Sequence, residues 1–118
     1  MPYNLSSMEN LTNEKIDAVV TQTKPGVYAL DKTATPGFKI SYVGRADDDL
    51  NKRLKNWVGE YKYFKFEYAT SPKDAYEKEC ELWHDHGGAE GKLDNKIHPD
   101  CPNGANWKCP EPDCERSK

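Results

Sequence analysis

The chain contains 118 residues, of which 36% are hydrophobic and 31% are charged, and its formal net charge is −3. This length supports one domain with a short appendage and excludes a second independent core. Because no apolar run approaches the roughly 18 residues of a membrane span and the first residues lack the pattern of a signal peptide, we expect a cytoplasmic protein with no membrane partner. An acidic chain is also poorly suited to holding nucleic acid by its overall charge.

A polar leader and a helix are expected over residues 1–24. Asn10 or Thr12 can cap this helix, and the sequence Lys24-Pro25-Gly26 ends it. Two strands are predicted next, at residues 26–30 and 38–44, separated by a run of turn-forming residues. The pattern indicates an antiparallel hairpin.

A second helix, a third strand and a third helix are expected after the hairpin. One of the three consecutive aspartates at 47–49 can cap the second helix, and residues 63–69 alternate as a strand buried on one side does. Ser71 and Pro72 supply an N-cap and a first-turn proline for a helix that runs to about His86. Together these elements predict an α+β fold, with a small, mainly antiparallel three-stranded sheet flanked by helices.

Positive charge is concentrated in one short segment. Residues 50–65 carry five basic side chains and one acidic side chain, whereas residues 66–118 carry seven basic and twelve acidic ones. Aromatic side chains are interleaved with the lysines here, which is typical of surfaces where bases stack and phosphates are neutralised. We assign Trp57 to the core because it falls on the apolar face of the second helix. The candidate nucleic-acid contacts are Lys52, Lys55, Tyr61, Lys62 and Lys65.

The last 25 residues hold four of the eight prolines and three of the four cysteines, which predicts an irregular tail over residues 98–118. A structural zinc ion is one interpretation, with a fourth ligand from a histidine or from a Cys or His of the preceding helix. Reduced thiols and a disulfide stay open as alternatives, because the tail has no Cys-x-x-Cys pair. The candidate zinc ligands are Cys101, Cys109, Cys114 and His98.

Glu79 interrupts the apolar stripe of the last predicted helix. Its neighbours one helical turn away are Ala75, Tyr76, Leu82 and Trp83. A carboxylate buried against a sheet costs several kcal/mol unless a cation, a metal ion or hydrogen-bond donors meet it. The position therefore indicates either a buried salt bridge to an arginine or a functional site.

Several short features occur in a fixed order along the chain. Gly26-Val27-Tyr28 is followed by Tyr42-Val43-Gly44, then by Arg53 in the next helix, by the helical Glu79 and finally by Asn95. In this order and context the chain resembles the GIY-YIG nuclease superfamily. The resemblance covers residues 25–97 and implies a nuclease-like domain of that fold, preceded by the leader and helix and followed by the tail.

The resemblance implies hydrolysis of a phosphodiester bond with the help of one Mg²⁺ or Mn²⁺ ion. It casts Glu79 as the single protein carboxylate that holds the ion, a role suited to a hard oxygen ligand. Arg53 and Arg45 would contact the scissile phosphate through their planar guanidinium groups. Asn95 matches a late asparagine that positions groups near the site.

Tyr28 and Tyr42 are the candidates to take a proton from the attacking water. A phenol is a weak base near neutral pH, so nearby cations are needed to favour the phenolate. We favour Tyr42 because it adjoins Arg45, although the sequence does not separate the two tyrosines. Arg45 stands where many relatives have lysine, so proton transfer at this position is lost while its charge is kept.

The sequence therefore predicts a divalent-metal-dependent endonuclease with DNA, including branched or single-stranded DNA, as its favoured substrate. Sequence-specific recognition usually needs about 1,000 Å² of contact. A domain this small would thus read nucleic-acid shape or be delivered by a protein partner. Two other interpretations stay open, namely a nucleic-acid-binding module of the same fold without activity and a zinc-stabilised protein-interaction domain.

Overall fold

The computed structural model describes residues 5, 8–32, 40–86, 93–94 and 107–110. The strands are β1 (Glu9–Asn10), β2 (Gly26–Asp31), β3 (Tyr42–Ala46) and β4 (Tyr63–Tyr68), and the helices are α1 (Asn13–Val19), α2 (Leu50–Lys55) and α3 (Pro72–Asp85). The strands form one sheet in the order β1-β4-β2-β3, and each pair of neighbours is antiparallel. Within this described part of the chain, no helix has the length and apolar character needed to cross a membrane.

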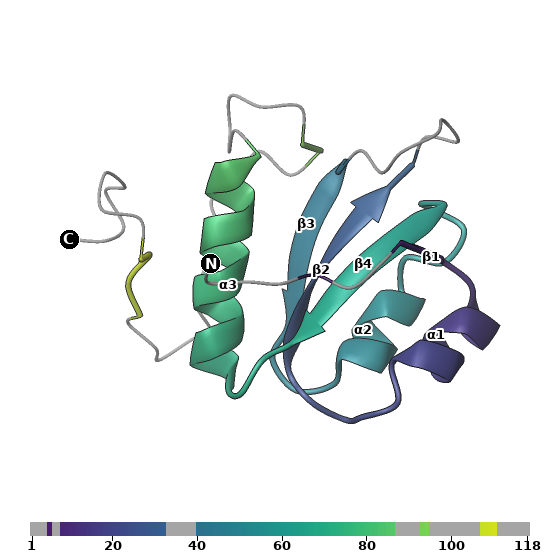
Figure 1. Ribbon diagram of the computed structural model, residues 1–118, viewed down its shortest axis with the longest axis horizontal. Coiled ribbons are helices and arrows are strands. Elements are labelled where there is room, and N and C mark those ends of the chain that lie inside the picture. The colour runs from purple at the N-terminus through teal and green to yellow at the C-terminus, as the bar shows by residue number, and fades with distance from the viewer. Residues whose placement is uncertain (1–4, 6–7, 33–39, 87–92, 95–106, 111–118) are drawn as a thin grey trace.

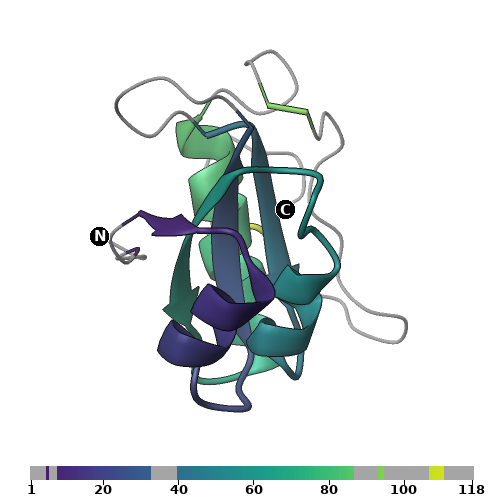
Figure 2. The ribbon, with the colours of Figure 1, turned by 90° about the vertical axis from the view of Figure 1, so that its right-hand side faces the viewer.

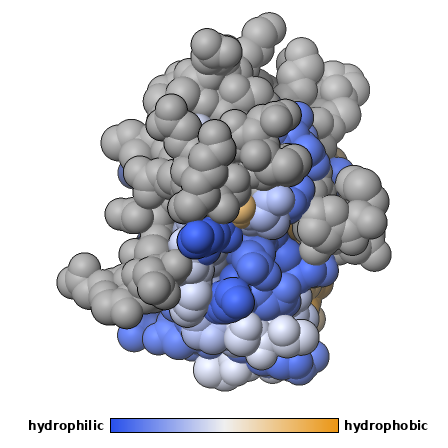
Figure 3. All heavy atoms as spheres, turned by 90° about the vertical axis from the view of Figure 1, so that its left-hand side faces the viewer, coloured by the Kyte–Doolittle hydropathy of each residue, from blue (hydrophilic) through white to orange (hydrophobic). Residues whose placement is uncertain are grey.

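The sheet lies between two helical layers (Figure 1). Helices α1 and α2 pack against one face and against each other, whereas α3 covers β2 and β3 on the other face. Figure 2 shows α1 and α2 side by side in front of the sheet. On the opposite side of the molecule, the coloured surface in Figure 3 is mainly hydrophilic, as expected where α3 turns its polar face outward. The α+β class predicted from the sequence is confirmed.

Alternation along β2 divides the core between the two layers. Tyr28 and Leu30 pack with Phe64 in the core that α1 and α2 cover. Ala29, which lies between them in the strand, packs instead with Leu82 of α3. This is the period of two that a pleated strand imposes, and it allows one strand to supply side chains to both faces of the sheet.

The prediction of three strands is wrong because the sheet has a fourth strand, β1. Its residues Glu9 and Asn10 pair with Phe64 and Tyr63 of β4. The next residue extends the contact, since the Leu11 N–H donates to the Lys62 carbonyl at 2.9 Å. A two-residue strand has no periodicity of its own, so only the tertiary pairing with β4 defines it.

The helix caps agree with the sequence. The side chains of Thr12, Asp49 and Ser71 each accept a hydrogen bond from the backbone N–H three residues later. However, α2 ends at Lys55 with Asn56 as its C-cap. The prediction that the helix continues through Trp57 is therefore wrong, and Trp57 lies in the turn that follows.

Two other element boundaries differ from the predictions. Helix α1 ends at Val19, several residues before Lys24, because the intervening Thr21 and Thr23 favour helix poorly. Strand β3 begins at Tyr42 and extends to Ala46, later than the predicted strand at 38–44, of which residues 38–39 lie outside the described residues.

Gly44 allows the buried ring of Tyr28 to lie across the edge strand. The two residues are Cα partners in the β2–β3 ladder. A Cβ atom added to Gly44 would lie 2.5 Å from both Cζ and Oη of Tyr28, which is well inside van der Waals contact. The phenol of Tyr28 therefore lies over β3, at the edge of the sheet.

Replacing Gly44 with alanine is expected to destabilise the fold by about 1–3 kcal/mol, because the added methyl group overlaps the Tyr28 ring. Urea unfolding would measure the loss. The same substitution in a Tyr28→Ala background should cost clearly less, since the overlapping ring is then absent. An equal cost in both backgrounds would show that the ring of Tyr28 is not what excludes a side chain at Gly44.

Candidate active site

A cleft of about 180 Å³ opens at the β3 edge of the sheet. It is lined by Tyr28, Tyr42, Gly44, Arg45, Asp47, Arg53, Trp57 and Glu79. The lining residues come from β2, β3, α2, α3 and the turns after β3 and α2. Both tyrosines, both arginines and the glutamate that the sequence assigns to catalysis are thus brought to one place.

The cleft joins the two faces of the sheet across its edge. Tyr28 and Tyr42 lie on the face covered by α2, with their rings stacked at a centroid distance of 6.5 Å. Arg53, which is exposed on α2, approaches from the same face. Glu79 reaches the cleft from α3, on the other face of the sheet. Gly44 of β3 lines the cleft as well, and the Tyr28 phenol occupies the space that a side chain there would take.

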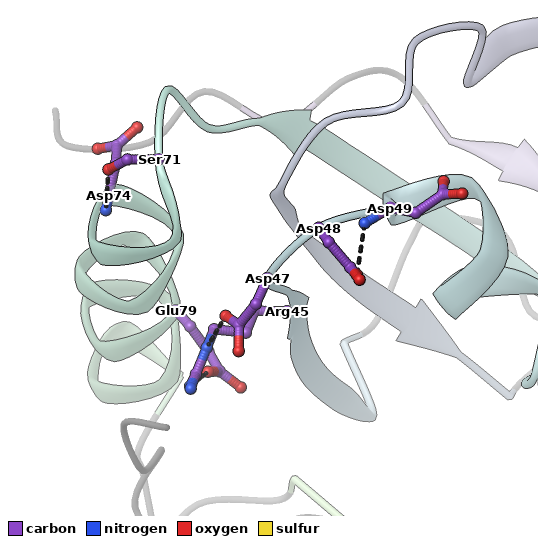
Figure 4. Close-up of polar contacts among 7 residues, drawn as sticks. All are labelled: Arg45, Asp47, Asp48, Asp49, Ser71, Asp74 and Glu79. Atoms are coloured by element: carbon purple, nitrogen blue, oxygen red, sulfur yellow. Dashed lines mark hydrogen bonds and ion pairs between the residues drawn. The ribbon is translucent and has the colours of Figure 1, made fainter. Parts of the chain in front are cut away.

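Glu79 points from α3 toward β3 and pairs with Arg45 (Figure 4). The Nη1 atom of Arg45 donates to Oε1 of Glu79 at 2.7 Å, while its Nε atom donates to Oδ1 of Asp47 at 2.8 Å. The side chains of Arg45 and Glu79 are only 12% and 9% exposed. The predicted burial of Glu79 is confirmed, and its partner is an arginine that also lines the cleft.

Burial raises the pKa of Glu79 from an ordinary value of 4.5 to about 7, although Arg45 opposes the shift by its charge and its hydrogen bond. Burial also favours loss of the Arg45 proton, but the hydrogen bond to Asp47 and the charge of Glu79 outweigh it and raise the pKa of Arg45. Arg45 therefore remains charged. Glu79 can exchange a proton near neutral pH.

Trp57 contacts both tyrosines of the cleft. Its Nε1 atom donates to Oη of Tyr28 at 2.8 Å, and its ring lies 4.6 Å from that of Tyr42. Because an indole N–H only donates, Oη of Tyr28 accepts this bond and keeps its own hydrogen for another partner. Trp57 packs on the core as the sequence predicts. The sequence did not predict that Trp57 lines the cleft, because it placed Trp57 on a longer helix instead of in the turn after α2.

Burial raises the pKa of both tyrosines. For Tyr28 the hydrogen bond from Trp57 lowers the pKa in part, and the positive charge of Arg53 acts in the same direction. For Tyr42 the negative charge of Glu79 raises the pKa further, while Arg53 again lowers it. Additional positive charge in the cleft would favour the phenolate in the same way as Arg53 does.

The lysines predicted to contact nucleic acid from α2 differ in their surroundings. Lys52 is exposed and lines a pocket of about 250 Å³ together with Arg53. Lys55 instead pairs with Asp17 of α1, with Nζ 2.7 Å from the carboxylate oxygen. Lys52 therefore lies beside the cleft, because Arg53 lines both hollows, whereas Lys55 links the two helices.

The other predicted contacts are divided between two faces. Tyr61 and Lys62 line a pocket of about 460 Å³ beside β1 and the end of β2. Lys65 is the Cα partner of Ala29, which packs with α3, so Lys65 lies on the α3 face of the sheet. The five residues do not form one continuous surface.

Four sequence predictions fall outside the described residues, at Asn95, His98, Cys101 and Cys114. Their roles, and the zinc site that three of them were assigned to, stay predictions. Of the zinc candidates, the structure places Cys109, which is buried and packs with Cys80 and Tyr76 of α3.

Glu79 and Asp47 give the cleft two carboxylate side chains, which are the oxygen ligands that Mg²⁺ and Mn²⁺ prefer. No cluster of three or more His, Cys, Asp or Glu side chains able to hold a metal ion occurs in the part of the chain that the structure describes. Mg²⁺ usually keeps several waters and binds through one or two protein carboxylates with substrate phosphates. The donor set of the cleft fits such an ion.

Comparisons of the chain with family models, with curated proteins and with solved structures found no match. The resemblance to GIY-YIG nucleases therefore depends on the residues themselves. Of those residues, the structure brings Tyr28, Tyr42, Arg53 and Glu79 together in one cleft.

The stability of the wild-type protein is expected to fall relative to Glu79→Gln as the pH rises. With a pKa of about 7 in the folded state against an ordinary value of 4.5, Glu79 holds a proton in the folded protein that the unfolded chain has released. Stability therefore declines with rising pH inside this window. We expect a relative loss on the order of 1–3 kcal/mol between about pH 5 and about pH 8.

Urea unfolding at each pH, with a chelator present, measures this difference. Glu77→Gln, at a position of α3 outside the cleft, is the matched control and should follow the wild type. A gap between the wild type and Glu79→Gln that stays constant with pH would contradict the raised pKa of Glu79.

Proposed function

We propose that this chain is a divalent-metal-dependent endonuclease of the GIY-YIG type, which hydrolyses phosphodiester bonds in DNA. The observation that supports the proposal most is the convergence of two tyrosines, two arginines and a buried glutamate on one cleft. The resemblance depends on the order of these residues along the chain and on the strands and helices predicted to carry them, but it does not require their side chains to meet. A coincidental sequence match would not be expected to collect them at one edge of the sheet.

The two arginines take different parts in the proposed reaction. Arg53 is exposed at the cleft, so its guanidinium can contact two oxygens of the scissile phosphate. Arg45 is engaged with Glu79 and Asp47. Arg45 therefore positions the Glu79 carboxylate and adds positive charge to the cleft. It does not bind the phosphate through two guanidinium N–H groups as Arg53 can.

Hydrolysis requires a water oxygen to attack phosphorus while the bond to the leaving oxygen breaks, and the water must give up a proton. Tyr42, the more exposed of the two tyrosines, accepts this proton. Tyr28 is buried beside it and is held by Trp57, so it orients the water through its remaining hydroxyl hydrogen. The charge of Arg53 favours the phenolate form of Tyr42.

Glu79, with Asp47 beside it, would hold Mg²⁺ or Mn²⁺. When bound, such an ion neutralises charge on the phosphate and makes a water molecule more acidic. The hydrogen bond from Arg45 fixes the direction of the Glu79 carboxylate at the cleft. In the proposed reaction, Glu79 acts in its ionised form.

The small cleft leaves little surface for reading a base sequence. Among the residues that the structure describes, the positive side chains that line the cleft and the neighbouring pocket are Arg45, Arg53 and Lys52. The protein would then recognise a branched or single-stranded shape, or a partner protein would deliver it to its substrate.

A nucleic-acid-binding module without activity is the second candidate. The observation in its favour is the ion pair itself, because Arg45 already occupies one oxygen of Glu79. In such a module Glu79 would serve only to hold α3 against β3.

Cleavage is tested by incubating the protein with plasmid, single-stranded and branched DNA in the presence of Mg²⁺ or Mn²⁺. We expect cleavage of at least one substrate, none with a chelator, and a rate at least about 100-fold lower in Glu79→Gln, which keeps the size of the side chain but not its charge. Glu77→Gln should cleave at the wild-type rate. Cleavage that Glu79→Gln leaves unchanged would refute the mechanism, and metal-independent binding without cleavage would favour the second candidate.

The role of Trp57 is tested separately with Trp57→Phe, which keeps an aromatic ring and removes the N–H donor to Tyr28. The cleavage rate should fall by about tenfold, the value of one hydrogen bond of ordinary strength. Trp57→His restores a ring N–H and should recover part of the rate. Circular dichroism checks that each variant is folded, and equal rates in Trp57→Phe and the wild type would exclude the positioning role.

A further inference from the structure

A row of aromatic rings leads from the active-site cleft to the pocket of about 460 Å³. At the cleft, the ring of Tyr42 lies 4.6 Å from that of Trp57 and 6.1 Å from that of Tyr61. The rings of Trp57 and Tyr61 are 5.7 Å apart, and Tyr61 lines the pocket. The two hollows are therefore connected by side chains on which nucleic-acid bases stack.

Two donors at the pocket converge on one anionic group, the carboxylate of Asp94. Lys32 donates from Nζ to Oδ1 at 2.9 Å, and Tyr61 donates from Oη to Oδ2 at 2.7 Å. Lys32 follows β2, Tyr61 belongs to the connection between α2 and β4, and residues 93–94 lie above that connection in Figure 2. The fold thus brings three distant segments together around a single negative charge.

The contact is open to exchange with another anion. The side chains of Lys32 and Asp94 are 55% and 36% exposed. Ion pairs exposed to this degree usually contribute no more than about 1 kcal/mol to stability. A phosphate offers the same kind of oxygen acceptor as a carboxylate, so it can replace Asp94 on the two donors at small cost.

Among the described residues, the charged side chains that line the pocket are Lys32, Lys62 and Glu60, and Asp94 meets the site through its bonds to Lys32 and Tyr61. Once Asp94 is displaced, the two lysines exceed the one glutamate. The pocket lies a short distance from the cleft. Tyr28 of β2 and Lys32, the first residue after β2, are four residues apart, or about 13 Å at the rise of a strand. A nucleic-acid strand with its scissile phosphate in the cleft can place a phosphate here a few nucleotides away.

We propose that this pocket binds the single-stranded flank of a nucleic-acid substrate. A backbone phosphate replaces Asp94 on Lys32 and Tyr61, Lys62 contributes a second positive charge, and a base stacks on the ring of Tyr61. The identity of the ligand rests on the proposed nuclease function. Asp94 occupies the phosphate position while no strand is bound, and it competes with weakly held anions.

The experiment measures binding of a dye-labelled oligothymidylate by fluorescence anisotropy over a series of salt concentrations, with a chelator present to prevent cleavage. Asp94→Asn keeps the shape of the side chain and removes its charge. It should bind about threefold to tenfold more tightly than the wild type, because no carboxylate has to be displaced. Its salt dependence should match that of the wild type, because the same phosphate contacts form in both complexes. Glu14→Gln on exposed α1 makes the same change in net charge and should alter neither quantity.

Two further variants separate the donors. Lys32→Ala should weaken binding and should abolish the gain that Asp94→Asn produces, because the released cation is then absent. Tyr61→Ala should weaken binding by about 5-fold to 100-fold, whereas Tyr61→Phe should retain most of the affinity, since it keeps the stacking surface. Circular dichroism confirms that each variant is folded.

Equal gains in Asp94→Asn and Glu14→Gln, or a gain that persists in the Lys32→Ala background, would overturn the site. Tighter binding of duplex than of single-stranded DNA, with no effect of Tyr61→Ala, would also overturn it.

The experiments distinguish failure of the nuclease proposal from failure of the pocket proposal. Absence of cleavage with the expected binding pattern removes the nuclease and leaves the pocket, whereas cleavage with unaltered binding in these variants removes the pocket alone.

Discussion

The ion pair between Arg45 and Glu79 fastens the α3 layer to the edge strand of the sheet. Both side chains are largely removed from solvent, so each partner depends on the other, and removing one partner of such a pair typically costs 3–5 kcal/mol. The pair forms only when α3 lies against β3 with Glu79 facing the strand. A wrong rotation of the helix would bury Glu79 without a partner, and the requirement to satisfy this charge helps select one arrangement of helix on sheet.

The same interaction determines what the cleft can do. Because Glu79 is satisfied by a residue of the cleft wall, its charge stays at the boundary between the core and solvent. The phenol of Tyr28 fills the space that a side chain at Gly44 would take, and both phenols reach the same opening as Glu79 from the other face of the sheet. The packing of α2 and α3 on the sheet therefore holds a carboxylate, a guanidinium and two phenols with shifted pKa values in one cleft.

Much of this arrangement can be read from local patterns. The cap at Ser71 and the burial of Glu79 follow from side-chain chemistry within a few residues, and the structure confirms them. For the first two helices the sequence leaves more than one cap open, and the structure selects Thr12 and Asp49. The features that were missed depend on contacts between distant segments. Strand β1 exists only through β4, Arg45 was assigned to a phosphate and not to Glu79, and nothing near Tyr61 in the sequence indicates its bond to Asp94.

The order of strands in the sheet, β1-β4-β2-β3, also has a kinetic consequence. Strand β2 is central to the pairing but meets β4 only after the chain has passed through β3 and α2, and the cleft also needs α3. Contacts with such long sequence separation form late and cooperatively. A chain still being synthesised therefore lacks the cleft until α3 has emerged, and no fragment that ends before this helix can assemble it.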